Sequence, residues 1–384
     1  MMLSDKRLLV KKLFACLFAV FAFHFCGAQI PVNNPIDPGD TELVQAVDFL
    51  SRYLKEFTRS HVPDYREYWS TADCAVYKRP DQLVYGINTE AATYIIGKPT
   101  ILYAKPENGY VHIKTLFGRG DSGKVSVMSI TNHYVQRDEN NGLHFISPIS
   151  LVKDWKTTVV ENITYHYPAY HMFDKKKARV LADAVRKLQA DWGLAPINIR
   201  YYFADTKEEL EHLRGFDFTV AMGNRDKPSG MSDDVDNIVY CGGWGEDYFH
   251  EVVHVYLNRH YPESPLREGL AVFYGGSLGH DLEWHIKRLN NYLQQHKETD
   301  LNKPEGFYYM DNYTNPYSTI MGMLCLAAYD KDGIAGLKRV MTYTSMDDVF
   351  VKEFGVANGG RDDFLRKMIA EEALPQPAPK ERMK

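Results

Sequence analysis

Two histidines four residues apart, His250 and His254, constrain this chain more than any other pair of residues. Side chains at this spacing lie about 40° apart around an α-helix, so both imidazoles can bind one metal ion. Glu251 then lies beside the ion and does not bind it. The order His-Glu-x-x-His is typical of a zinc site in which the glutamate acts as a general base toward water. The segment that begins at Phe249 therefore predicts a helix built around a metal ion.

A catalytic zinc site uses three protein ligands and leaves a fourth position open, so a third ligand must follow the histidine pair. His260 lies six residues after His254, which is the spacing of the metzincin pattern. In that pattern a glycine lets the chain turn back, but here the position is Leu257. Leucine favours continued helix, which would rotate His260 by about 240° away from His254. This geometry argues against His260.

Glu268 is the other candidate for the third ligand, fourteen residues after His254. Two prolines interrupt the chain between them, and Arg267 to Tyr274 predicts a second helix that ends at a pair of glycines. Two helices joined by a short loop can return Glu268 to the histidine pair. We therefore predict Glu268 as the third ligand, and keep His260, or the absence of a metal, as the alternatives.

The pentapeptide His-Glu-Val-Val-His, thirteen further residues and then Glu-Gly-Leu-Ala resemble the gluzincin metallopeptidases, in particular the peptidase MA-like group of secreted bacterial proteins. The resemblance covers Thr158 to Leu374, and its specific part is Phe249 to Tyr274. It implies that His250, His254 and Glu268 bind Zn2+. It also implies Glu251 as the catalytic base and a peptide or protein as the substrate. The distance between the second histidine and the glutamate is shorter than in thermolysin-like and aminopeptidase-N-like members, which leaves the subfamily open.

Hydrolysis at such a site also needs a hydrogen-bond donor for the developing oxyanion. In aminopeptidase-N-like gluzincins a tyrosine before a glycine-containing helix supplies it, and the resemblance implies Tyr317, within Asn-Pro-Tyr-Ser-Thr-Ile-Met-Gly. Ordinary packing is the alternative role for Tyr317, because the chain contains 26 tyrosines. Tyr313, His280 and His285 are further candidates, although both histidines are more typical of solvated helix positions.

Two polar residues near the histidines are candidates for orienting the imidazole rings. Asn258 lies four residues after His254 on the same helix face, and Asp247 lies three residues before His250. Surface positions on an amphipathic helix are an equally good interpretation of both residues.

The beginning of the chain predicts export. Four basic residues between positions 6 and 12 precede an apolar run from Leu13 to Phe25, and Cys26-Gly27-Ala28 offers small residues for cleavage. We expect residues 1–28 to be a signal peptide whose removal leaves a periplasmic or extracellular protein without stable membrane insertion. The apolar run is shorter than the about 20 residues of a comfortable transmembrane helix. An uncleaved anchor and a lipid on Cys26 are the alternatives.

Charge and cysteine content narrow the classes of partner. Residues 1–28 carry four positive charges and one negative charge, so their removal changes the formal net charge from −5 to −8. A mildly acidic chain without a basic cluster argues against a nucleic-acid partner. The remaining cysteines, Cys74, Cys241 and Cys325, are odd in number and widely spaced, which predicts buried thiols. One disulfide with one free thiol is the alternative, and the oligomeric state is left open.

Length and patterning predict an α+β chain with two domains. Residues 29–155 begin with a helix whose apolar residues, from Leu43 to Phe57, fall at helical spacing. Short alternating runs separated by Asn-Gly and Gly-Arg-Gly turns then predict strands and hairpins. A helix followed by a curved antiparallel sheet is compatible with a cone-shaped domain similar to nuclear transport factor 2.

Residues 156–374 are predicted to form a gluzincin-like catalytic domain, with a mixed sheet on the metal helix and a helical region that carries the glutamate. A helix from Asp174 to Gly193 and strands near residues 197–203, 218–222 and 238–241 precede the metal helix. The resemblance implies an edge strand that aligns the substrate backbone. Thr219 to Asn224 is the candidate, with Ser229 to Asp236 as a mobile rim loop; an ordinary strand and turn are the alternative. The proline-rich residues 375–384 predict a disordered tail.

Three functions are compatible with these patterns. The first is a zinc metallopeptidase that hydrolyses peptide bonds. The second is a non-catalytic binding protein on the same scaffold, and the third is a zinc hydrolase specialised for glycopeptide or cell-wall peptide substrates. We favour the first, because the three ligands and Glu251 are intact.

Overall fold

The computed structural model describes residues 30–84, 92–121, 123–223 and 227–374. These residues form a mixed α+β structure that divides into two compact units. The predicted signal peptide and the predicted disordered tail lie outside the described residues. The chain enters each unit more than once. Of the described residues, 30–76, 80–84, 92–121, 123–151 and 215–220 belong to the first unit, and 77–79, 152–214, 221–223 and 227–374 belong to the second.

The first unit is built on a five-stranded antiparallel sheet. Strands β1 to β4 pair in chain order, and β8 pairs with β3. The β1–β2 turn contains Asn108 and Gly109, both with positive φ, as a two-residue hairpin turn requires. The elements are α2 (Thr41–Glu56), α3 (Thr71–Val76), α4 (Ala92–Ile96), β1 (Lys98–Glu107), β2 (Tyr110–Asp121), β3 (Lys124–Arg137), β4 (Leu143–Ile146), α5 (Pro148–Leu151) and β8 (Phe216–Thr219).

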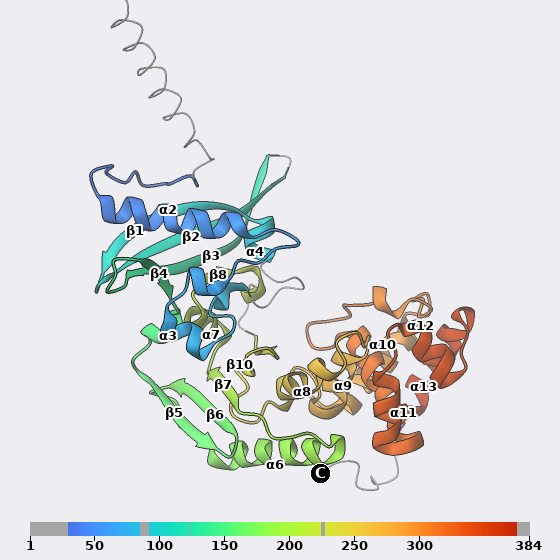
Figure 1. The fold of residues 1–384 in the computed structure, drawn as a ribbon. Coiled ribbons are helices and arrows are strands. Elements are labelled where there is room, and N and C mark those ends of the chain that lie inside the picture. Colours follow the sequence, from blue (N-terminus) through green and yellow to red (C-terminus); the bar gives the residue numbers. More distant parts are fainter. Residues whose placement is uncertain (1–29, 85–91, 122, 224–226, 375–384) are drawn as a thin grey trace, which may run out of the picture. The chain divides into compact units, whose positions relative to one another are not determined.

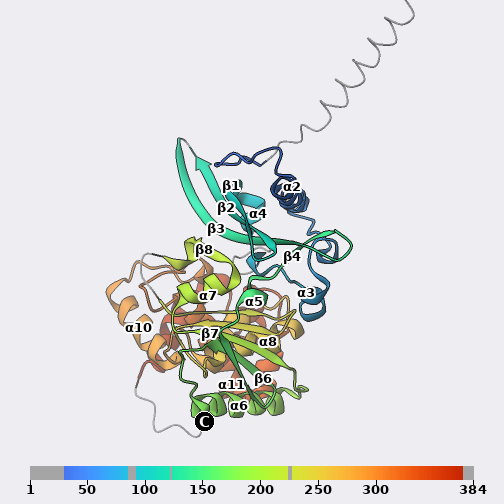
Figure 2. The ribbon, with the colours of Figure 1, turned by 90° about the vertical axis from the view of Figure 1, so that its left-hand side faces the viewer.

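Helix α2 begins at a cap, because the side chain of Asp40 accepts a hydrogen bond from the Leu43 amide at 3.2 Å. Its apolar side is buried, and the helix lies across the sheet (Figure 1). Figure 2 shows how long and curved β2 and β3 are. The sheet supplies fully buried residues such as Ile113 and Phe117, so the core of this unit lies between α2 and the sheet.

The second unit combines a mixed five-stranded sheet with a helical region. The strand order is β5-β6-β7-β10-β9, in which β6, β7 and β10 are parallel and the two edge strands run antiparallel to their neighbours. The elements are β5 (Trp155–Val160), β6 (Ile163–Pro168), α6 (Lys175–Trp192), β7 (Ile199–Ala204), α7 (Lys207–Arg214), β9 (Ser229–Asp233), β10 (Ile238–Gly242), α8 (Phe249–Leu257), α9 (Arg267–Gly275), α10 (Leu282–Gln295), α11 (Pro316–Met341), α12 (Met346–Asp348) and α13 (Arg361–Glu372).

Helix α6 has the ends that the sequence predicts. The side chain of Asp174 accepts hydrogen bonds from the amides of Lys176 and Lys177, and Gly193 ends the helix in the left-handed conformation with φ of 70°. The buried face of α6 packs in one continuous core with strands β6, β7 and β10 and with α8. Within the described ranges, no helix is both long and apolar enough to cross a membrane.

The predicted edge strand over Thr219 to Asn224 is wrong. The strand in this region, β8, ends at Thr219 and pairs with β3 in the first unit, and Asn224 lies outside the described residues. One of the two edge strands of the second sheet is β9, inside the segment predicted as a mobile rim loop. β9 contains serine, glycine and aspartate, which have low strand propensity. It nevertheless forms a strand, because it pairs with β10 through backbone hydrogen bonds.

Candidate metal centre

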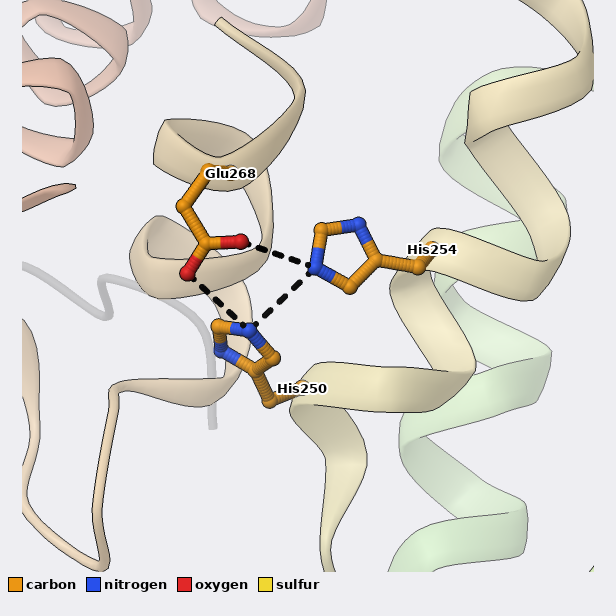
Figure 3. Close-up of side chains that lie close together, drawn as sticks. All are labelled: His250, His254 and Glu268. Carbon is orange, nitrogen blue, oxygen red and sulfur yellow. Dashed lines mark hydrogen bonds and ion pairs between the residues drawn. The ribbon is translucent and has the colours of Figure 1, made fainter. Parts of the chain in front are cut away.

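Three side chains converge between α8 and α9 (Figure 3). His250, His254 and Glu268 each offer one ligand atom, and these atoms lie within 4.8 Å of one another. The two Nε2 atoms are 3.3 Å apart. The carboxylate of Glu268 places Oε1 3.5 Å from Nε2 of His250 and Oε2 3.3 Å from Nε2 of His254. Both histidines are buried, whereas the Glu268 side chain keeps 43% exposure, so the cluster opens toward solvent on the glutamate side.

Helix α8 holds the two histidines rigidly because almost every residue in it is buried. Val252 and Val255 pack in the core on the side away from the histidines. The helix ends at Leu257, and a 3-10 turn over Asn258–His260 continues its direction. His260, the alternative third ligand, is exposed in that turn and does not belong to the metal-binding group found among the described residues.

Two glycines explain how α9 comes close enough to supply Glu268. A Cβ atom at Gly269 would lie 2.5 Å from the backbone carbonyl carbon of Met321 in α11, and one at Gly275 would lie 2.5 Å from the amide nitrogen of His250. These distances are shorter than real side chains tolerate, so α9 packs backbone to backbone against both neighbours. The close packing of α9 on α11 therefore explains why position 269, in Glu-Gly-Leu-Ala, is a glycine.

Hydrogen bonds fix the orientation of both imidazole rings. Nδ1 of His250 donates to the carbonyl oxygen of Gly276 at 2.7 Å, and Nδ1 of His254 donates to Oδ1 of Asn258 at 3.2 Å. Because both acceptors lack a proton to give, Nδ1 of each ring carries a proton, and Nε2 of each imidazole, when neutral, would offer its lone pair to an ion in the cluster. Asp247, the second predicted orienting residue, instead lies 3.8 Å from the Lys177 amine.

The carbonyl of Gly276 has no signal of its own in the sequence, because every residue carries the same backbone carbonyl group. The one indication is the glycine pair that ends α9. Gly276 has φ of 67°, which favours glycine, and this conformation directs the chain into the turn that faces His250.

The charges of the cluster favour a cation at its centre. Burial opposes protonation of His250, but contact with Glu268 and the nearby charge of Glu251 outweigh burial and raise the pKa of His250 to about 9. Burial alone would raise the pKa of Glu268, but the two histidines outweigh it and hold that pKa below its usual range. Two imidazoles, each held by a hydrogen bond at Nδ1, together with one carboxylate fit the ligand set of a catalytic zinc site.

Glu251 directly follows the ligand His250 in α8 and is 6% exposed. Edge strand β9 passes directly beside it: a Cβ atom at Gly230 would lie 2.6 Å from Oε1 of Glu251 and 2.4 Å from Cε1 of Tyr248. The Tyr248 ring in turn stacks on His250, with centroids 5.8 Å apart and planes at 14°. The carboxylate of Glu251 therefore lies against the backbone of β9, beside the same glycine that packs on Tyr248.

The predicted oxyanion donors lie in different surroundings. Tyr317 is half-buried in the first turn of α11, where its amide donates to the Phe307 carbonyl at 3.0 Å and its ring meets the edge of Tyr308. Among the described residues, Tyr317 makes no hydrogen bond or ring contact with the three ligands or with Glu251. Tyr313 is 55% exposed.

The two candidate histidines differ from the expectation of solvated helix positions. His285 is 1% exposed, because it lies on the inner side of α10, so that prediction is wrong. His280 lies before the helix, half-buried, and stacks on Trp284 with centroids 3.6 Å apart. Cys241 and Cys325 are buried free thiols, as the wide spacing predicts, whereas the free thiol Cys74 is only half-buried.

Comparisons with known proteins add no relative. No protein-family model matches the chain, and neither a curated protein nor a solved structure matches it.

Proposed function

We propose that this protein is an exported, zinc-dependent metallopeptidase that hydrolyses peptide bonds. One observation carries the proposal: His250, His254 and Glu268 converge on one point, and Glu251 lies beside them on the same helix as the histidines. Three ligands of this kind leave a coordination position open for chemistry. A gluzincin-type fold belongs to the proposal, supported by a mixed sheet that packs on α8 and a helical region that follows Glu268.

The proposal assigns each residue a task. A bound Zn2+ supplies a Lewis acid that lowers the pKa of water and polarises a substrate carbonyl. The Nε2 atoms of His250 and His254 and the carboxylate of Glu268 hold the ion. A carboxylate oxygen of Glu251 accepts the proton of the attacking water and later gives it to the leaving amine. The backbone of β9 at Gly230 packs against that carboxylate.

We assign the alignment of the substrate to β9. An edge strand can bind an extended peptide as an additional strand through its backbone groups. β9 is one of the two edge strands of its sheet, and Gly230 brings its backbone next to Glu251. A peptide paired with β9 would therefore pass near the proposed general base. β9 takes the role that the sequence assigned to Thr219 to Asn224.

Tyr317 is the proposed donor to the oxyanion. Burial raises the pKa of its phenol, so the hydroxyl keeps its proton at neutral pH and remains able to donate. Tyr317 lies one helical turn before Met321, whose backbone contacts Gly269 next to the ligand Glu268. The first unit, for which we propose a cone-shaped fold similar to nuclear transport factor 2, has no assigned part in the chemistry.

The ligand set is tested by removing one ligand at a time. We expect the wild-type protein to contain one equivalent of zinc and to cleave an unstructured protein such as casein. Glu268→Ala should lose both the zinc and the cleavage, because two histidines alone bind the ion weakly. His260→Ala is the matched control and should retain both. Loss of zinc in His260→Ala with retention in Glu268→Ala would show that the third ligand is assigned wrongly.

A further inference from the structure

The orientation of His250 depends on one backbone carbonyl. Nδ1 of His250 donates to the oxygen of Gly276 at 2.7 Å, and Gly276 caps the C-terminal end of α9. His254 has an acceptor at the end of its own helix, Asn258, whereas the acceptor of His250 lies in a turn 26 residues further along the chain. Whatever holds this turn in place therefore also holds the His250 ring.

The turn from Gly276 to His280 has an unusual backbone. Gly276, Leu278 and Gly279 all have positive φ, of 67°, 47° and 77°. A leucine in this region is strained, so the surroundings must hold it there. The turn is closed by two reciprocal hydrogen bonds, in which the amide of Ser277 donates to the His280 carbonyl at 2.9 Å and the amide of His280 donates to the Ser277 carbonyl at 3.0 Å.

A buried histidine of α10 anchors this turn. Nε2 of His285 donates to the Ser277 carbonyl at 2.8 Å, and this carbonyl belongs to the residue next to Gly276. A carbonyl only accepts, so the proton of His285 lies on Nε2 and Nδ1 is an acceptor. The hydroxyl of Thr314 donates to Nδ1 at 3.1 Å. His285 and Thr314 are each 1% exposed, so water does not replace either bond easily.

We propose that His285 is a positioning residue for the metal ligand His250, acting through the Gly276–His280 turn. The N–H at Nε2 of His285 holds the Ser277 carbonyl in place. This hydrogen bond thereby restrains the preceding peptide group, which contains the Gly276 oxygen. This inference rests on the proposed function, because it assumes that His250 binds a metal ion. Outer partners of metal-binding histidines set ring orientation and ligand strength, and their loss typically lowers metal affinity about 10–100-fold.

The anchor extends to the segment that leads into α11. The amide of Thr314 donates to Oδ1 of Asp311 at 2.9 Å, and Asp311 forms an ion pair with Arg288 of α10. The residues after Thr314 form the cap and first turn of α11, where Tyr317 lies. One connected set of contacts thus links the orientation of His250 to the beginning of the helix that carries the proposed oxyanion donor.

Two substitutions at position 285 separate positioning from simple packing. In His285→Gln, the side-chain amide can place a donor near the position of Nε2 and retain the bond to Ser277. In His285→Asn, the shorter amide reaches the position of Nδ1 and leaves the Ser277 carbonyl without this donor. His296→Asn, at the other end of α10, is the matched control, because His296 contacts Tyr292 and Glu298 and not the turn.

The readouts are zinc affinity, measured by competition with a chromophoric chelator, and the visible spectrum of the Co2+-substituted full chain. We expect His285→Asn to bind zinc about 10–100-fold more weakly with an altered Co2+ spectrum, while His285→Gln and His296→Asn stay near wild type. Urea unfolding of the metal-free proteins provides the stability reference.

Two results would overturn the inference while leaving the proposed function in place. Unchanged zinc affinity in His285→Asn would show that the turn holds the Gly276 carbonyl without His285. An equal loss in the Gln and Asn variants, in proportion to their loss of stability, would show a packing role only. If the wild-type protein binds no zinc at all, the proposed function fails and this inference fails with it. If the wild-type protein binds zinc tightly and the variants bind it equally well, only this inference fails.

Discussion

Gly230 and Glu251 are in direct contact: a Cβ atom on Gly230 would lie 2.6 Å from Oε1 of the glutamate. The backbone of an edge strand thus touches the proposed general base, and a side chain at position 230 would push the carboxylate away. We predict that Gly230→Ala keeps its zinc but cleaves peptides about 100-fold more slowly, because small displacements of a reacting group cost rates of this order. Zinc content and initial cleavage rates test this prediction. Ser232→Ala, two residues further along β9, is the control and should remain near wild type.

Gly269 allows α9 to pack on α11. In a free helix, replacement of glycine by alanine stabilises by about 0.5–1 kcal/mol. Here the new Cβ atom would lie 2.5 Å from the backbone of Met321, so we predict that Gly269→Ala lowers the free energy of unfolding by about 1–3 kcal/mol. Urea unfolding followed by circular dichroism measures the change. A Cβ atom at Gly359 would meet no other atom within 4 Å, so Gly359→Ala provides the control and should change the free energy little. Equal effects in the two variants would argue against the close packing.

Tyr317 is the proposed donor to the oxyanion, and a single substitution removes its hydroxyl. If the phenol donates to the oxyanion, Tyr317→Phe should lower kcat about 100–1000-fold, with zinc content and KM near wild type. Steady-state kinetics on a fluorogenic peptide give both parameters. The same substitution at Tyr313, which is exposed, should leave kcat unchanged. An unchanged kcat in Tyr317→Phe would show that another group stabilises the oxyanion.

A buried histidine in the first unit predicts how stability depends on pH. Burial, and to a lesser extent the charge of His112, lower the pKa of His133 from 6.5 to about 3. The unfolded chain therefore binds a proton at His133 between about pH 6.5 and pH 3 that the folded chain does not. This contribution to stability is complete above about pH 6.5 and is lost as the pH falls toward 3.

The matched variant is His133→Gln, which cannot titrate but can still donate to the Tyr94 hydroxyl, 3.0 Å from Nε2. Between pH 7 and pH 4 we expect the wild type to lose about 3 kcal/mol more unfolding free energy than this variant. Urea unfolding at several pH values measures the difference. Parallel pH profiles of the two proteins would show that His133 titrates normally in the folded state.

Local spacing was sufficient to predict much of the candidate site. The interval between His250 and His254 fixes their common helix face, and Leu257 excludes the sharp return that His260 would need. Glu268 then follows from a second helix after a proline-containing loop, and the structure brings these three predicted ligands together. The role of Asn258 could be predicted from spacing as well, because Asn258 shares the helix face of His254.

The remaining features depend on contacts between distant segments, which periodicity does not encode. The pairing of β8 with β3 joins residues about 90 positions apart in two regions that the sequence places in different domains. β9 has weak strand propensity and forms because β10 lies beside it. His285 has the appearance of a polar helix residue, and its burial follows from the turn and from Thr314, which bind its two nitrogens.

The most direct test of the central claim is a paired measurement on the wild-type protein and Glu251→Gln: bound zinc per chain, and cleavage of a peptide library. Glutamine has nearly the shape of glutamate but cannot accept the proton of water. We predict one zinc per chain in both proteins, with peptide cleavage only in the wild type. Absence of zinc from freshly purified wild-type protein, or undiminished cleavage by Glu251→Gln, would contradict the account.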